Sequence, residues 1–268
     1  MTAFIGIILG GLVVLLANHA EGDTPTVLLK TGAAIIVFGG TFAALLVHGG
    51  ARRLLGAVKA LRFLLKPPAT DSWKLVNDLC EWADTARKKG IISLEAEADQ
   101  LTDRYLKIGL SMMVNNEPYE RVRETLYMAG DVEDREGESA AELWEAAGGY
   151  APTIGVLGAV LGLIHVMLHL DHPSELGPGI ATAFVATVYG LFSANVVFIP
   201  IGARLKTVAA SRTAFREVAM EGMLMLSRQE SPIRIRTFLE HLLDPRRKGG
   251  DDGERARAEP ELEASPAE

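Results

Sequence analysis

The stretch AAGGYAPTIGVLGAVLGLIHVMLHL, residues 146–170, decides the fold class, because it contains no Asp, Glu, Lys or Arg. A helix needs about 20 mainly apolar residues to cross the roughly 30 Å of hydrocarbon in a bilayer. The stretch exceeds that length and carries glycines at helical spacing. It therefore predicts a membrane-spanning helix.

Three more uncharged stretches of similar length occur in the chain, at residues 1–20, 31–51 and 176–203. Together they predict an all-α integral membrane protein with four transmembrane helices, at 1–20, 28–51, 146–170 and 176–203. The first stretch could instead be a secretory signal peptide. Because Met1 to Phe4 include no basic residue and a second apolar stretch follows closely, a retained helix is the better interpretation.

The basic residues of the connections predict the orientation of the four helices. Lys and Arg are enriched after the second and fourth stretches, at Arg52, Arg53, Lys59, Arg62 and Lys66, and at Arg204, Lys206, Arg212 and Arg216. The other two connections are short and hold one basic residue, Lys30. By the positive-inside rule, both termini are cytoplasmic and the chain is a multi-pass protein.

This orientation leaves a cytoplasmic domain at 52–145, a cytoplasmic segment at 204–245 and an acidic tail at 246–268. Apolar residues at helical spacing predict a helical domain, with Gly90, Pro118, Gly130 and Gly137 as candidate helix breakers. The junction with the third helix is left open between a continuous helix and a break at Gly148-Gly149. The tail, rich in Glu, Ala, Pro and Arg, is predicted to be disordered.

One corner of the cytoplasmic domain concentrates charges of both signs. Gly90 follows Arg87-Lys88-Lys89, which is typical of a helix end, and Ser93 then stands as an N-cap before Leu94-Glu95. The pattern fits a solvated face whose charges complement the helix dipoles. It also fits a docking site, and charge pattern alone does not decide between them.

Polar residues and prolines interrupt the last two apolar stretches. The polar set comprises Thr153, Thr182, Thr187, Tyr189, Ser193 and Asn195, and the prolines are Pro152 and Pro200. Small residues at four-residue spacing indicate tight helix packing. Hydroxyls beside prolines further suggest a hydrated path or a moving element. Since no Asp or Glu lies at membrane depth, an ion-binding carboxylate has to come from another chain.

The chain carries few signs of enzyme chemistry. Cys80 is the single cysteine, which excludes intramolecular disulfides and paired-cysteine metal sites and favours a buried structural thiol. We find no phosphate-binding glycine motif, zinc spacing or nucleophile elbow. No catalytic residue, metal site or cofactor is predicted, and the net charge of -7 gives no reason to expect a nucleic-acid partner.

Several motifs resemble those of the MotA/PomA subunits of flagellar motor stators, over nearly the full length to about residue 240. They are GIILG at 6–10, IVFGGT at 36–41, ARKKGIISLE at 86–95, APTIG at 151–155, GAVLGLI at 158–164, GPGIA at 177–181, TVYG at 187–190 and SANVVFIPI at 193–201. The resemblance implies a bacterial inner-membrane protein that couples ion flow to motility.

The resemblance also implies partners and roles. A ring of these subunits, expected to be a pentamer, would surround two copies of a MotB or PomB partner whose helix supplies the ion-binding aspartate. The ring would push on the rotor protein FliG. By motif position, Pro152 and Pro200 match the residues of conformational coupling, and Arg87, Lys88 and Glu95 match the rotor-contacting charges.

The resemblance places the ion pathway at Ala159, Thr187 and Tyr189. Sodium-type relatives tend to have threonine where this chain has Ala159, which offers no oxygen to a dehydrating sodium ion. Protons are therefore the expected ion and sodium the alternative. An ExbB/TolQ-type subunit, usually with three spans, and a membrane scaffold without ion coupling are the competing functions.

Overall fold

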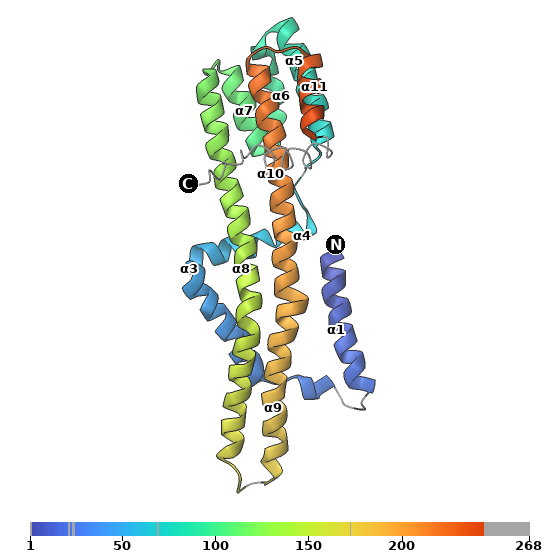
Figure 1. The fold of residues 1–268 in the computed structure, drawn as a ribbon, viewed down its shortest axis with the longest axis vertical. Coiled ribbons are helices and arrows are strands. Elements are labelled where there is room, and N and C mark those ends of the chain that lie inside the picture. Colours follow the sequence, from blue (N-terminus) through green and yellow to red (C-terminus); the bar gives the residue numbers. More distant parts are fainter. Residues whose placement is uncertain (1, 21, 23–24, 69, 172, 244–268) are drawn as a thin grey trace, which may run out of the picture. The chain divides into compact units, whose positions relative to one another are not determined.

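The computed structural model describes residues 2–20, 22, 25–68, 70–171 and 173–243, and every regular element in that part of the chain is a helix (Figure 1). The N-terminal elements are α1 (Thr2–Ala20), η1 (Pro25–Leu28), α2 (Thr31–Ala34), η2 (Ile35–Gly39), α3 (Gly40–Ala60) and α4 (Arg62–Leu65). They are followed by α5 (Ser72–Lys89), η3 (Ile91–Leu94), α6 (Glu95–Gln100), α7 (Arg104–Val114) and α8 (Tyr119–Met167). The last are α9 (Pro173–Phe192), η4 (Ser193–Phe198), α10 (Ile199–Ser227) and α11 (Pro232–Leu243).

Three helical stretches are long and apolar enough to cross a membrane: Thr31–Leu65, Tyr119–Met167 and Leu176–Ser227. A fourth apolar helix, Ile5–Ala20, is shorter. The all-α prediction is thus confirmed for the described residues. The count of four spans and their boundaries stay predictions, and the tail at 246–268 lies outside the described residues.

The chain forms two compact units, of which the first comprises Met1–Pro68 and Glu133–Ser211. Within it, α8 and α9 pack closely along an antiparallel seam (Figure 1). A Cβ on Gly190 would lie 2.5 Å from the carbonyl oxygen of Ala151, and one on Gly162 would lie 2.8 Å from the Cβ of Ala183. Only glycine permits such an approach of two backbones.

A sharp bend divides α3 at Gly50, whose φ of 69° and ψ of 168° lie outside the helical region. A side chain would strain this conformation, so glycine is required there. After the bend, residues 51–65 form what we call the elbow segment. Its Ala57 and Leu64 are buried in one apolar cluster with Leu143 and Trp144 of α8.

The second unit comprises Ala69–Val132 together with the chain from Arg212. Its core is built from α5, α7, α8, α10 and α11, and its fully buried members include Leu79, Leu110, Leu126, Met223 and Leu239. Aspartates start two of its helices: Asp71 accepts a hydrogen bond from the Lys74 amide, and Asp103 accepts one from the Leu106 amide. The described residues within 52–145 are largely helical, as the periodicity predicted, but 52–68 and 133–145 belong to the first unit, and the predicted domain boundaries stay a prediction.

Gly130, Gly137 and the pair Gly148-Gly149 do not break a helix, because all lie inside α8. At two of these positions, neighbouring side chains leave little room for a Cβ atom, which explains why glycine stands there. A Cβ on Gly137 would lie 3.1 Å from that of Ala209, and one on Gly148 would lie 2.4 Å from Ile199 Cγ1. Gly137 and Gly148 therefore permit close packing. The breaker interpretation was wrong for Gly130 and Gly137, and the junction left open at Gly148-Gly149 is a continuous helix. Pro118 does precede the helix.

The boundary at Gly90 is confirmed and the N-cap role of Ser93 is wrong. Helix α5 ends at Lys89, and Gly90 adopts a φ of 86°. A 3₁₀ turn, η3, then occupies Ile91–Leu94, and the Ser93 hydroxyl donates to the Gly90 carbonyl at 2.7 Å. Helix α6 begins at Glu95 without a side-chain cap. The hydroxyl stabilises the turn instead of starting the helix.

Candidate functional site

Pro152 lies at the closest approach of α8 and α9. Its Cα would be 3.2 Å from a Cβ on Gly190, and the Gly155 Cα would be 3.1 Å from the same atom. The proline is half-buried and α8 continues through it. Proline has no N–H, so the helical ladder loses one hydrogen bond where the neighbouring backbone is nearest. Near Pro152, helix α8 therefore lacks one backbone hydrogen bond while it packs tightly against α9.

Pro200 stands at a second irregularity of the same unit. It follows η4, a π-helical segment in which the Ile199 amide donates to the Ala194 carbonyl, five residues back. The Asn195 side chain donates to the Leu191 carbonyl at 2.9 Å, and Ser193 Oγ donates to the Gly190 carbonyl at 3.2 Å. Both side chains therefore bond back to carbonyls of their own helix beside the widened ladder. Pro200 itself is exposed.

Ala159 on α8 and Thr187 on α9 are both half-buried. Thr153 and Thr182, like Ser193 and Asn195, donate to carbonyls of their own helix. Thr187 differs from the other members of the polar set, because its hydroxyl has no hydrogen-bond partner among the described residues. A polar group without a partner in an apolar setting is unfavourable unless something else binds it.

Tyr189 is held by backbone groups before the second apolar stretch. Its hydroxyl donates to the Leu28 carbonyl and accepts from the Lys30 amide at 3.3 Å, and its ring lies 6.0 Å from that of Phe38. Lys30 is the N-cap residue of α2, which begins at Thr31. The phenol thus fixes the start of this helix against α9, a role that the sequence did not indicate.

The charged corner lies in the second unit. Arg87, Lys88 and Glu95 are all exposed, and Lys88 is paired with Asp84 at 2.6 Å. Between them Ile92 is 69% exposed, whereas Leu94 two residues on is fully buried. The buried leucine and the Ser93 hydrogen bond fix the turn. The corner therefore presents an exposed apolar side chain flanked by charges of both signs.

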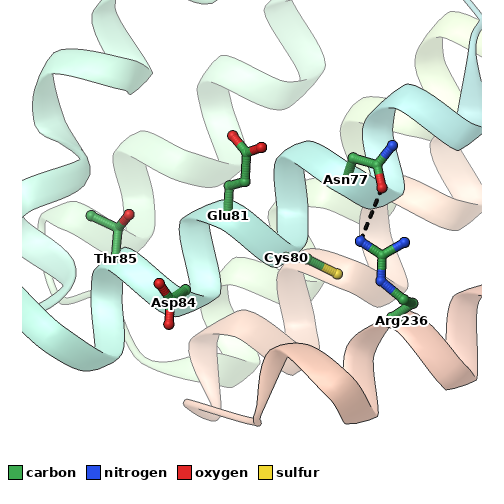
Figure 2. A pocket seen from close by; sticks show the side chains of 6 residues that line it. All are labelled: Asn77, Cys80, Glu81, Asp84, Thr85 and Arg236. Atoms are coloured by element: carbon green, nitrogen blue, oxygen red, sulfur yellow. Dashed lines mark hydrogen bonds between the residues drawn. The ribbon is translucent and has the colours of Figure 1, made fainter.

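A polar cavity of about 510 Å³ opens beside α5 and α11 (Figure 2). In it, Arg236 donates to the Asn77 side chain at 3.0 Å, and Cys80 lies beside this pair (Figure 2). Burial raises the pKa of the Cys80 thiol, which outweighs the opposing effect of the nearby Arg236 charge. The cysteine is therefore a protonated structural thiol.

The structure does not bring all predicted site residues together. Pro152 and the backbone around Thr187 meet at the seam, since a Cβ on Gly155 would lie 3.4 Å from the Thr187 Cα. Arg87, Lys88 and Glu95 form the separate charged corner. The sequence analysis did not predict that Ile92 is exposed at the charged corner, although its position between basic and acidic residues could have indicated this. It also missed Trp144, which contacts residues far away in the sequence.

Comparisons with known proteins show which family the chain resembles. Residues 97–218 match the family model described as the MotA/TolQ/ExbB proton channel family. Motility protein A of Bacillus subtilis (strain 168) is 33% identical over 232 residues, which cover 86% of each chain.

Two solved structures share the fold. The flagellar MotAB stator complex from Bacillus subtilis matches with a TM-score of 0.79 and 31% identity, covering 92% of this chain and 97% of that one. The C. jejuni MotAB structure matches with a TM-score of 0.81 and 26% identity, covering 91% and 97%.

The apolar helices and these likenesses define the class: a membrane protein of the MotA/TolQ/ExbB type. Within that class, the chain belongs to the motility protein A family and is a subunit of a flagellar stator. The predicted MotA/PomA resemblance is confirmed. The relative and both structures reported above are motility proteins and not ExbB or TolQ subunits.

Proposed function

We infer that this stator subunit conducts protons in a complex with a MotB-type partner and transmits the resulting movement to the rotor. In this proposal the chain has four spans in the bacterial inner membrane and both termini in the cytoplasm. Copies of it form a ring, taken as a pentamer by family resemblance. The partner helix supplies the titrating carboxylate, since the four apolar stretches contain no Asp or Glu.

The hydroxyl of Thr187 is the observation that carries the proposal. Other members of the polar set in α8, α9 and η4 are hydrogen-bonded, which leaves Thr187 free to bind water or a partner's carboxylate. Ala159 adds no oxygen ligand, which favours a proton moving along water over a sodium ion. Tyr189 contributes by holding the start of the second stretch.

Coupling is assigned to Pro152 and Pro200. Both remove a hydrogen bond from a helix of the first unit, one at the seam and one beside η4. A helix that lacks a backbone hydrogen bond can change its bend there without breaking that bond. Protonation of the partner's carboxylate would change the electrostatic field at this seam and shift the balance between two backbone arrangements.

Contact with the rotor is assigned to the charged corner. Arg87 and Glu95 are exposed, and Lys88 forms an ion pair with Asp84. We take FliG as the rotor partner on the family resemblance. Exposed charges at an interface mainly steer and orient a partner, so reversal of one charge should weaken docking without unfolding the chain.

Ion conduction is tested by isosteric replacement of the free hydroxyl. The chain is reconstituted with its MotB-type partner in vesicles, and proton uptake is followed with a pH-sensitive dye under an imposed potential. Thr187→Val should lower the uptake about fivefold, the effect of losing one hydrogen bond to the conducted species. Thr182→Val is the matched control, because the Thr182 hydroxyl is bonded to the Pro178 carbonyl.

Three outcomes would count against the ion assignment. Equal proton uptake by Thr187→Val and the unchanged chain would remove Thr187 from the path. Uptake of sodium without protons would overturn the choice of ion. Swimming that persists after collapse of the proton gradient, with sodium maintained, would do the same in cells.

Rotor contact is tested by Arg87→Glu. We expect normal membrane insertion and partner assembly, together with reduced torque on a tethered bead. Arg123→Glu is the matched control, since Arg123 is exposed on α8 and makes one weak ion pair at 3.8 Å. Normal torque in Arg87→Glu would exclude the corner as a docking site.

A further inference from the structure

Trp144 links the elbow segment to the π-helical segment within the first unit. Its side chain is 8% exposed, and its indole N–H donates to the Ala57 carbonyl at 3.0 Å, 87 residues away in the sequence. On the other side its ring lies 5.8 Å from the ring of Phe198, with the planes tilted by 39°. Trp144 thus contacts both the elbow segment and η4.

The hydrogen bond to Ala57 replaces one that the helix lacks. Within a regular helix the Ala57 carbonyl would accept from the Leu61 amide, but that amide donates to the Val58 carbonyl at 3.2 Å as α3 ends. Carbonyls of a last turn need partners from elsewhere. Trp144 supplies one in a buried place, where a missing partner is costly.

The contact with Phe198 lies at the end of η4. Phe198 is 7% exposed and stands two residues before Pro200. A π-helical segment holds one extra residue in its turn, so its return to α-helical hydrogen bonding rotates the residues beyond it by about 100° and shifts them by about 1.5 Å. Such a movement of Phe198 would change its contact with the ring of Trp144.

A second link between α8 and the elbow segment is weaker. Arg53 Nε donates to Ser139 Oγ at 2.7 Å, and its guanidinium lies 3.5 Å from Glu142. The side chains of Arg53 and Glu142 are 43% and 65% exposed, so solvent screens this pair. The buried contact through Trp144 is therefore the stronger of the two mechanical links.

We propose that Trp144 is a positioning residue of the stator cycle, which transmits changes in the η4–Pro200 region to the elbow segment. This inference rests on the proposed coupling role of Pro200. It adds a residue that neither binds the ion nor touches the rotor. A rearranged η4 moves Phe198, Phe198 moves the indole, and the indole moves the end of α3 through the Ala57 carbonyl.

Trp144→Phe is the decisive variant, because it keeps an aromatic ring against Phe198 and removes the N–H donor. We expect insertion, partner assembly and vesicle proton uptake to match the unchanged chain. Torque per stator unit, measured from the step heights of bead speed as units join a motor, should fall about fivefold, as expected when one buried hydrogen bond no longer favours the coupled state. Trp73→Phe is the matched control, since Trp73 is 57% exposed on α5.

A second variant tests the other contact. Phe198→Leu removes the ring that faces Trp144 and keeps an apolar side chain, and it should also lower the step height. The double variant should lose little more than the stronger single variant, because both interrupt one path. Fully multiplicative losses would show two independent effects and overturn the proposal.

Other outcomes separate this inference from the proposed function. If Trp144→Phe lowers the number of assembled units and leaves the step height unchanged, Trp144 is merely structural and the inference fails. An unchanged step height with unchanged assembly also overturns it. If the unchanged chain takes up no protons and rotates no motor with its partner, the proposed function fails instead.

Discussion

Gly190→Ala tests the packing of the α8–α9 seam with the smallest possible change. The added Cβ would lie 2.5 Å from the Ala151 carbonyl oxygen, 3.1 Å from the Gly155 Cα and 3.2 Å from the Pro152 Cα. All three are backbone atoms, so no side chain can rotate away. Helix α8 has to move off α9 by roughly 1 Å, and overpacking of this kind costs about 1–3 kcal/mol.

Gly149→Ala on α8 is the matched control. A Cβ there meets nothing within 4 Å inside the chain. Alanine is a better helix former than glycine, so this variant should be stabilised by about 0.5–1 kcal/mol. Both substitutions add one methyl group, and they should change the free energy of unfolding in opposite directions.

The assay is the free energy of unfolding of the purified chain in mixed micelles, measured by SDS titration with tryptophan fluorescence. We expect Gly190→Ala to unfold at lower SDS than the unchanged chain and Gly149→Ala at higher SDS. Equal midpoints for the two variants would refute the reasoning, since they would show that the seam is not in backbone contact. A lower midpoint for Gly149→Ala alone would refute it as well.

Three further predictions concern the second unit. Because burial raises the pKa of the Cys80 thiol, maleimide labelling at neutral pH should be slower than that of glutathione, and a comparable rate would contradict a protonated, buried thiol. Burial also raises the pKa of Asp78, so Asp78→Asn should increase the free energy of unfolding at neutral pH. This gain should shrink as the pH falls through the raised pKa, because the carboxyl group of Asp78 then becomes neutral. A gain that does not depend on pH would contradict this explanation. Asp71→Ala should lower that free energy by about 1 kcal/mol through loss of the N-cap of α5, and urea titration at unchanged slope would measure it; no change would show that the cap is dispensable.

Features that depend on local sequence were predictable. An uncharged stretch such as 146–170 has few alternatives to a membrane helix, and cations followed by Gly90 marked the end of α5 correctly. The rule for Ser93 failed because a serine hydroxyl both accepts and donates. Here it donates to the Gly90 carbonyl, which favours a 3₁₀ turn over a capped helix start.

Features that depend on tertiary contacts were not predictable. Gly130 and Gly137 have the composition of breakers, and the distinction between a break and a close approach depends on what packs beside them. The π-helical segment η4 has no composition signal that separates it from an α-helix before Pro200. The hydrogen bond between Trp144 and Ala57 joins residues from different parts of the chain, and no local pattern indicates such a pair.

For the candidate site, the sequence predicted which polar residues lie in the apolar stretches. It did not predict which hydrogen bonds each of them makes. The sequence treats Thr182 and Thr187 alike, but one hydroxyl is bonded to its own helix and the other has no partner among the described residues. The phenol of Tyr189 reaches Leu28, 161 residues away in the sequence. These distinctions arise from the backbone geometry of the packed helices.

The internal hydrogen bonds of α9 and η4 also affect how this part of the chain enters a bilayer. Residue-based insertion scales assign each Thr, Ser and Asn the cost of an unbonded polar side chain. Thr182, Ser193 and Asn195 each donate one hydrogen bond to a carbonyl of their own helix, so this donor can be satisfied as soon as the helix forms. The helix is then more hydrophobic than its composition suggests, and these hydrogen bonds need no partner chain during insertion.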